Sequence, residues 1–303
     1  MRSIIRNHAV AYLIICAIAV SSDGQRKSKG NEQGYFGPVQ IVRTESVEFS
    51  LKEGKVKRGG RKVDSIERFD KQGRLIERVA LKDNGAILVS EKNFYDARGR
   101  LNETLLKHDR FVYLPDRVTY KYDGKGNSIE GNGYDTNGKL VNRNEYVYDE
   151  KGRVLQWTAI SYHPAENSKP HRWTYTYDER GRKKEVLAFS DEGSGFTPTD
   201  SLGAPHRKLY VYGAGDKPEI VLSFKVDGSF AGLESTKYDR NWNEIEEVEY
   251  DATGSLKKRV RYTYKFDRFG NWIQQNTYKW VEENGQAAYQ LSEISYQIIR
   301  FFR

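Results

Sequence analysis

The sequence predicts an all-β fold built from repeated antiparallel hairpins. Three observations lead to this expectation: a short motif recurs along the chain, its copies follow a half-period of about 13 residues, and aromatic and polar residues alternate between copies. Apart from the extreme N-terminus, no long window shows a sustained apolar repeat of 3.6 residues. We expect an antiparallel β-meander that coils into a spiral or a curled sheet.

The recurring motif is an aromatic residue, Asp, two variable residues and Gly, often followed by a cation. Its Asp can accept hydrogen bonds from backbone N–H groups further along the turn, and its Gly can take the positive φ of a bulged hairpin. A degenerate copy begins at Tyr238-Asp239 and has Trp242 in place of Gly. The predicted turn-forming pairs are Asp70 and Gly73, Asp96 and Gly99, Asp123 and Gly126, Asp135 and Gly138, Asp149 and Gly152, Asp178 and Gly181, Asp251 and Gly254, and Asp267 and Gly270.

The spacing of the motif defines the repeated unit. Asp70 and Asp96 are 26 residues apart, whereas Asp123 and Asp135 are 12 apart. One strand of ~5–6 residues plus one hairpin loop occupies the shorter interval. Residues 41–303 therefore provide about 20 strands, and a sheet of that width does not stay flat. The longest gap between motifs contains a candidate loop or hinge at 191–206.

The predicted strands have one packed face and one wet face. Trp173-Thr-Tyr175-Thr-Tyr177 and Tyr262-Thr-Tyr264 alternate with period 2. Aromatic residues make up 13% of the chain and charged residues 30%. Because a transmembrane barrel needs a continuous apolar band on its outer face, we expect no integral membrane protein once the N-terminus is removed.

The N-terminus is typical of an export signal. Arg2 and Arg6 precede an apolar run, residues 9–20, and small residues follow, so 1–21 is the predicted signal peptide. Lipoprotein anchoring at Cys16, the only cysteine, is disfavoured because Ile15 stands where a small residue is needed. We expect a periplasmic or extracellular protein without disulfides, with a flexible polar leader at 22–40 and one repeat domain at 41–303.

The repeated Tyr-Asp-x-x-Gly-Arg units resemble the YD (RHS) repeats of bacterial exported and surface proteins and of animal teneurins, over roughly residues 64–275. The resemblance implies a spiralling scaffold sheet, which in some members of that family is proposed to bind carbohydrate. The array is short, the Asp-Pro-x-Gly core of the family is missing, and no toxin domain follows. Residues 134–139 are also similar to a hairpin repeat of the MORN type.

No motif indicates catalysis, a metal or a cofactor. Walker, nucleophile-elbow, zinc-helix and dinucleotide patterns are all missing from the sequence. The recurring Asp residues supply one carboxylate per turn, which favours turn formation over a calcium ladder. His163 and His171 lack a metal-ligand spacing to a Cys or Glu partner. We expect a protein that is not an enzyme and that has no metal or cofactor.

The remaining clues are aromatic and positive side chains. The formal net charge is +8, with cations at 55–62 and after the turn glycines, at Arg74, Arg100, Lys139, Arg153 and Arg182. They fit either attraction to anionic polymers or ordinary solubility and edge protection; nucleic acid does not fit an exported chain. A binding module would use an aromatic platform of Trp157, Trp173, Trp242, Trp272 and Trp280.

The functional expectation is an exported, non-catalytic binding or scaffold module of the cell envelope, with a glycan or an envelope protein as its partner. The first alternative is a purely structural repeat related to toxin shells. The second is a hydrolase without a recognisable motif, which would require a concave pocket with two close carboxylates.

Overall fold

The computed structural model describes residues 33–52, 55–108, 114–162, 170–190, 206–283 and 285–303. Every regular element in these ranges is a β-strand, which confirms the all-β antiparallel expectation, and none of them contains a helix able to cross a membrane. The strands are β1 (Val39–Lys52), β2 (Lys55–Arg58), β3 (Lys62–Phe69), β4 (Leu75–Leu81), β5 (Ile87–Tyr95), β6 (Leu101–His108), β7 (Arg117–Tyr122), β8 (Ser128–Tyr134), β9 (Leu140–Tyr148), β10 (Val154–Ser161), β11 (His171–Tyr177), β12 (Lys183–Ser190), β13 (Arg207–Tyr212), β14 (Pro218–Phe224), β15 (Phe230–Tyr238), β16 (Glu244–Asp251), β17 (Leu256–Phe266), β18 (Trp272–Glu283) and β19 (Gln286–Phe301).

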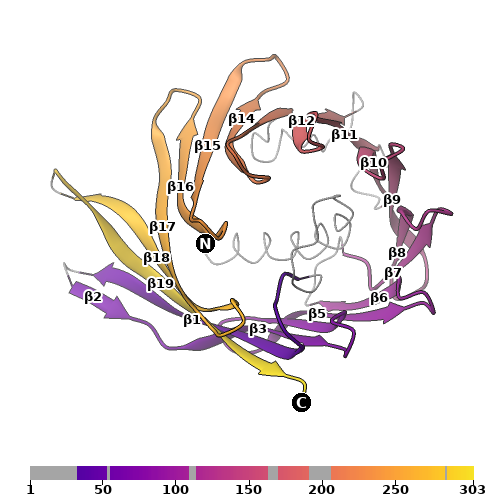
Figure 1. The fold of residues 1–303 in the computed structure, drawn as a ribbon, viewed down its shortest axis with the longest axis horizontal. Helices are drawn as coiled ribbons and strands as arrows, with labels where there is room; N and C mark the ends of the chain where they lie inside the picture. Colours follow the sequence, from indigo (N-terminus) through magenta and orange to yellow (C-terminus); the bar gives the residue numbers. More distant parts are fainter. Residues whose placement is uncertain (1–32, 53–54, 109–113, 163–169, 191–205, 284) are drawn as a thin grey trace.

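The sheet closes into a barrel (Figure 1). From β3 to β19 each strand pairs with its neighbour in the chain, and β1 lies between β3 and β19, antiparallel to both. Eighteen strands form the ring, and β2 pairs only with the far end of β1. The expected open spiral or curled sheet is wrong, because pairing of the first and last strands leaves the sheet no open edge.

Successive turns alternate between the two ends of the barrel. One end, which we call the Asp rim, carries the turns that begin at Asp70, Asp96, Asp123, Asp149, Asp178, Asp239 and Asp267. The other end, the opposite rim, carries the turns at 82–85, 135–138, 225–228 and 251–254. The short motif spacings therefore arise where a copy also occupies the opposite rim, as at Asp135 and Asp251.

The segment 33–38 identifies the inner face of the wall, because it runs inside the ring (Figure 1, indigo). Within it, Tyr35 donates a hydrogen bond to Glu67 and Gln33 accepts one from Arg78. Side chains along each strand alternate between the two faces of the sheet, and paired residues of neighbouring strands share a face. The register therefore shows which residues of each strand face inward. By this register Tyr120, Trp173 and Tyr262 face inward, and the list of outward residues includes Lys92, Lys121, Arg207, Lys237, Glu246 and Arg261.

The two clusters of buried hydrophobic side chains lie on one side of the ring. Val39, Val42, Phe69 and Leu75 form one cluster, and a second consists of Ala80, Leu88, Val89 and Leu106. Both lie on β1 and β3–β6. Elsewhere most inward side chains are half-buried, because a ring of this many strands is too wide for its walls to pack on each other.

The predicted leader is described only from residue 33, and there it is packed rather than flexible. The Asn271 side chain bonds both the N–H and the carbonyl of Phe36, and Val39 and Gln40 already belong to β1. The predicted boundary at residue 40 is therefore too late. The signal peptide with Cys16, residues 22–32 and 191–205 of the candidate hinge lie outside the described residues.

Candidate functional site

Each of the Asp-rim turns named above is organised by its carboxylate. At Asp149, Oδ1 accepts hydrogen bonds from the N–H groups of Lys151 and Arg153, both at 2.9 Å, and Oδ2 accepts one from Arg153 Nε at 2.6 Å. Gly152 has a φ of 77°, which an L side chain adopts only with strain. The motif residues therefore serve to form the turn.

The Arg of one turn also contacts the Tyr of the next turn on the same rim. The Arg153 guanidinium lies 4.6 Å from the centre of the Tyr177 ring, and the Tyr177 hydroxyl donates to the carbonyl of Val154 at 2.7 Å. We call this arrangement the Asp–Arg–Tyr staple. It recurs at Asp70, Arg74 and Tyr95, at Asp96, Arg100 and Tyr122, and at Asp178, Arg182 and Tyr212.

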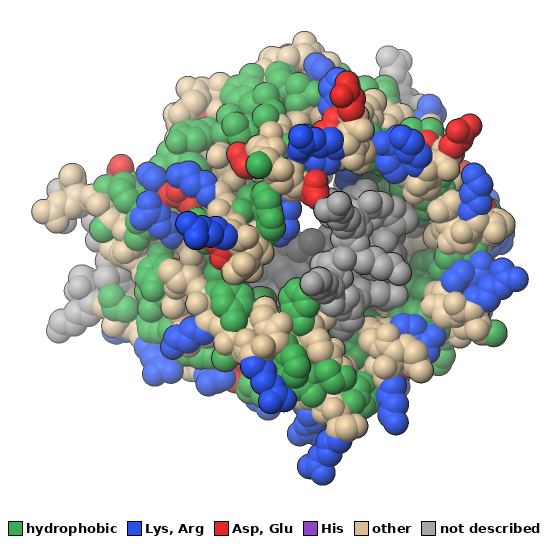
Figure 2. Space-filling model, viewed as in Figure 1, with side chains coloured by type: hydrophobic (Ala, Val, Ile, Leu, Met, Phe, Trp, Pro, Cys, Tyr) green, Lys and Arg blue, Asp and Glu red, His purple; other side chains and the backbone are tan. Residues whose placement is uncertain are grey.

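The staple accounts for four of the five post-turn cations. Arg74, Arg100, Arg153 and Arg182 are ion-paired to the Asp of their own turn, and Lys139 lies on the opposite rim. These cations therefore do not form one free positive edge. Lys and Arg side chains are instead spread around the ring (Figure 2). In the basic segment 55–62, Arg61 pairs with Glu45 and Lys62 with Glu48, while Lys57 and Arg58 are exposed.

Two of the five predicted platform residues come together on the inner wall. Trp157 of β10 and Trp173 of β11 are cross-strand partners whose rings stack at 4.2 Å, and Tyr146 of β9 continues the stack at 6.4 Å. The Asn144 side chain accepts a hydrogen bond from Trp157 Nε1 at 2.9 Å. We call this group of three rings the inner aromatic strip. It follows from register and alternation and takes no part in the staple.

The other three tryptophans lie elsewhere, so the five residues do not form a single platform. Trp242, with a φ of 64°, occupies the Gly position of a turn and contacts Tyr238 and Gly215. Trp272 begins β18 at the Asp rim, opposite Phe266. Trp280 packs edge-on against Tyr289 in the hairpin formed by β18 and β19.

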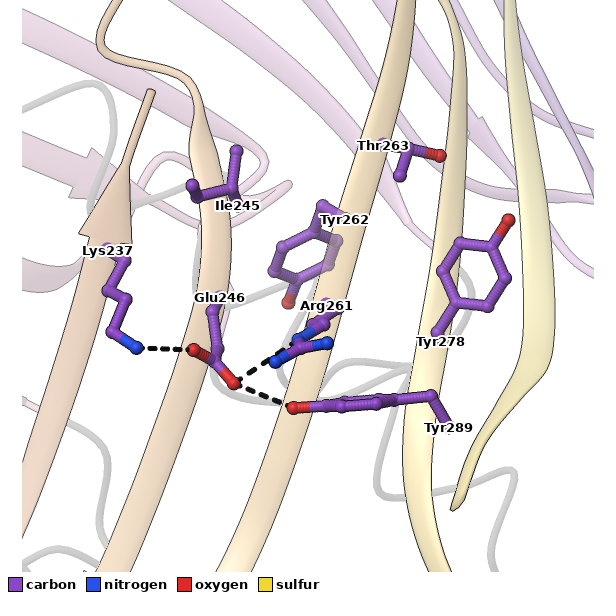
Figure 3. A pocket seen from close by; sticks show the side chains of 8 residues that line it. All are labelled: Lys237, Ile245, Glu246, Arg261, Tyr262, Thr263, Tyr278 and Tyr289. Atoms are coloured by element: carbon purple, nitrogen blue, oxygen red, sulfur yellow. Dashed lines mark hydrogen bonds and ion pairs between the residues drawn. The ribbon is translucent and has the colours of Figure 1, made fainter. Parts of the chain in front are cut away.

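A cleft of about 470 Å³ opens on the outer wall between β15 and β19. At its base Glu246 of β16 is only 4% exposed, and Figure 3 shows Lys237, Arg261 and Tyr289 directed at its carboxylate. The contact distances to that carboxylate are 2.8 Å from Lys237, 3.4 Å from Arg261 Nε and 2.7 Å from the Tyr289 hydroxyl, and Arg259 lies at 3.0 Å.

These partners keep Glu246 ionised. The hydrogen bonds from Lys237 and Tyr289 lower the pKa of its carboxyl to about 2, against the opposing effect of burial. Charge–ring contacts complete the cleft: the Arg261 guanidinium lies 4.1 Å from the centre of the Tyr289 ring, and that of Arg259 lies 5.2 Å from the Trp280 ring.

Sequence reasoning missed this cleft. One signal was available. The two strands of a hairpin pair outward from their turn, and for the turn at Asp251 and Gly254 this pairing places Glu246 opposite Arg261. Tyr289 lies in the part of the β18–β19 hairpin beyond the last β17–β18 pair, Val260 with Lys279, and the β18–β19 pairing contains a bulge; the motif specifies neither feature. Within the described part of the chain, no three His, Cys, Asp or Glu side chains gather as metal ligands; His171 begins β11, and His163 is not described.

Comparison with known proteins gives no family assignment. No family model matches the chain, and no curated protein matches it. Among solved structures, a porin-like protein from Bacteroides uniformis is 10% identical with a TM-score of 0.44, and the match covers 88% of this chain and 98% of that one. A porin-like protein from Bacteroides vulgatus is 12% identical with a TM-score of 0.35, covering 87% and 98%.

A TcdB2–TccC3 structure is 14% identical with a TM-score of 0.32, and the match covers 76% of this chain but 15% of that one. All three TM-scores are below 0.5, so these likenesses carry no argument about this chain.

Proposed function

We propose that this chain is an exported, non-catalytic scaffold and binding module of the cell envelope, which binds carbohydrate on the inner aromatic strip. The supporting observation is that Trp157 and Trp173 stack on each other on the inner wall and take no part in the Asp–Arg–Tyr staple. The motif tyrosines, such as Tyr148 and Tyr177, bond the backbone of the preceding strand. The stacked tryptophans instead form a rigid apolar strip bordered by Asn144.

In this proposal the outer wall of the barrel faces water and not a lipid bilayer. By register, cations occupy the outward positions of many strands, and the side chains of Lys92, Lys121, Lys237 and Arg261 are 62%, 65%, 67% and 51% exposed. A lipid-facing Lys or Arg near the bilayer midplane costs about 2–4 kcal/mol. We expect high-salt or alkaline buffer without detergent to extract the mature protein from cells; extraction by detergent alone would contradict this part of the proposal.

The test of the inner strip compares three variants on immobilised neutral polysaccharide. Trp157→Ala and Trp173→Ala should abolish salt-resistant retention of the protein, whereas Trp242→Ala, which removes a rim tryptophan, should leave it intact. Thermal melting of each variant separates loss of binding from loss of fold. If the wild-type protein is not retained on any neutral polysaccharide, the carbohydrate proposal is rejected.

A purely structural wall is the second candidate, and one observation favours it. The rings of Trp157 and Trp173 stack at 4.2 Å, so they cover part of each other's faces, which a sugar ring would otherwise use. On this alternative Trp157→Ala lowers the melting temperature and changes no binding property. The hydrolase alternative has less support, because the close carboxylate pairs Glu67 with Glu91 and Glu247 with Glu249 are bridged by Arg78 and Lys258.

A further inference from the structure

The outer cleft is separate from the inner aromatic strip, and it is closed by a different part of the chain. Its floor is formed by β15–β17, and the hairpin of β18 and β19 brings Tyr289 over Glu246, 43 residues away in the sequence (Figure 3). Tyr278 of β18 and Tyr289 of β19 both line the cleft, so the hairpin contributes an aromatic side chain from each of its strands.

The charges in the cleft do not balance. Lys237, Arg259 and Arg261 all contact Glu246, and this carboxylate is the only acidic side chain among the described residues that line the cleft. The lining itself therefore holds two cations, Lys237 and Arg261, and one carboxylate, which is an excess of one positive charge, and Arg259 contacts the carboxylate from outside the lining. Such an excess in a concave site raises the local concentration of anions.

Two of these cations also have donors that their contact with Glu246 does not use. Arg261 uses Nε for the carboxylate, so its two terminal nitrogens remain available for a bidentate contact, and its side chain is 51% exposed. The Lys237 side chain is 67% exposed. The hydroxyls of Thr263 and Tyr278 and the ring of Tyr289 also line the cleft, and the cleft volume lies within the roughly 300–1,000 Å³ of small-molecule sites.

We propose that this cleft binds the oxyanion group of an acidic saccharide, with Arg261 and Lys237 holding the anion and Tyr278 and Tyr289 supporting the sugar ring. A carboxylate or a sulfate can form the bidentate contact with Arg261. The glycan hydroxyls find donors and acceptors in Thr263 and Tyr278. This inference concerns the outer wall and does not depend on sugar binding by the inner aromatic strip.

The first experiment measures binding of three oligosaccharides to the mature protein by calorimetry: a sulfated heparin fragment, a uronate oligomer and a neutral glucan oligomer. Arg261→Ala should weaken binding of the acidic ligand at least fivefold. The matched control is Lys265→Ala, which removes an exposed cation from the same outer face of β17 and should change affinity less than twofold. Binding of either acidic oligomer with this pattern supports the proposal and identifies the anion.

Equal losses in Arg261→Ala and Lys265→Ala would instead indicate a general basic surface and overturn the proposal, as would the absence of binding to both acidic oligomers. A second variant separates a binding site from a structural clasp. Glu246→Gln keeps the shape of the side chain and removes its negative charge, so affinity for the acidic ligand should rise at least twofold even where the melting temperature falls. Unchanged or weaker binding by this variant, with the fold intact, also overturns the proposal.

Discussion

The two rims of the barrel use the same backbone turn but different side chains. On the Asp rim, Gly99 N–H bonds the carbonyl of Asp96 at 2.9 Å, and on the opposite rim Gly85 N–H bonds that of Lys82 at 2.8 Å; both glycines have φ near 80°. Only the Asp rim then adds the carboxylate, the guanidinium and the next tyrosine of the staple. The backbone turn makes each hairpin, and the staple ties neighbouring hairpins together.

This difference explains why the motif repeats at about 26 residues rather than 13. A staple needs an Asp and an Arg in one turn and a Tyr in the next turn of the same rim, so the selected positions recur once per pair of strands. The Asp turns of the opposite rim stop short of a staple: at Asp135 the carboxylate bonds the N–H of Lys139, but Lys139 has no described side-chain contact with it.

The largest effect should come from the feature that both rims share. Gly99→Val and Gly85→Val should each destabilise the fold by about 1–3 kcal/mol, because a β-branched residue adopts a positive φ only with strain. Gly60→Val is the control, since its backbone lies outside that region and its Cβ would meet open space. Chemical denaturation gives the free energies; a Gly60 variant as unstable as the other two would contradict the role of φ.

The next effect separates the rims. Asp149→Ala should cost about 1–2 kcal/mol, as for loss of a capping carboxylate, because it leaves two backbone N–H groups and Arg153 without their acceptor. Lys225 occupies the same turn position on the opposite rim, and Lys225→Ala should stay within about 0.5 kcal/mol of wild type. Equal losses in urea denaturation would show that the carboxylate adds nothing to the turn.

A smaller effect isolates the guanidinium. Arg153→Ala should destabilise the barrel by about 1 kcal/mol, through loss of a partly buried ion pair and of the contact with the Tyr177 ring. Lys139→Ala, at the equivalent position after the turn glycine of the opposite rim, should be nearly neutral. In the equivalent staple at Asp96, the Arg100 side chain is likewise only 31% exposed. If Lys139→Ala costs as much as Arg153→Ala, the staple is not specific to the Asp rim.

The smallest effect is electrostatic. The backbone N–H of Arg100, with its side chain and the N–H of Arg98, holds the pKa of Asp96 below its usual range. Stability from this carboxylate is therefore fully present above the unfolded pKa of about 4 and is lost as pH falls through the lower folded pKa. In NMR titrations Arg100→Ala should raise the pKa of Asp96 only part of the way toward its usual value, because the backbone donors remain. An unchanged pKa would show that the Arg100 side chain does not contribute to the shift.

The predictable part of this structure is local. Asp and Gly at fixed spacing specify a turn by their own hydrogen bonds and backbone freedom, and alternation specifies which of Trp157 and Thr158 shares a face with Trp173. The role of Arg153 was not recognised, because its partner Tyr177 lies 24 residues away and belongs to the next motif.

The unpredicted part depends on pairings that no local pattern contains. Closure requires β1 to pair with both β19 and β3. In the pairing with β19, Val42 lies opposite Ile299, and these two residues come from opposite ends of the chain. The outer cleft likewise depends on the length of the last hairpin, because a shorter one would not bring Tyr289 to Glu246. Both features combine separate strands, whereas the motif describes one turn at a time.

Closure of the barrel can be tested by a single cross-link. Ser46 of β1 and Ser295 of β19 are cross-strand partners, and antiparallel partners have the Cα separation of about 4.5–5.5 Å that a disulfide accepts. The chain outside the predicted signal peptide contains no cysteine, so a Ser46→Cys, Ser295→Cys variant has one pair to oxidise. The closed barrel predicts an intramolecular disulfide in the monomer, seen by intact mass and peptide mapping; two free thiols after oxidation would mean that the first and last strands are apart and that the sheet is open.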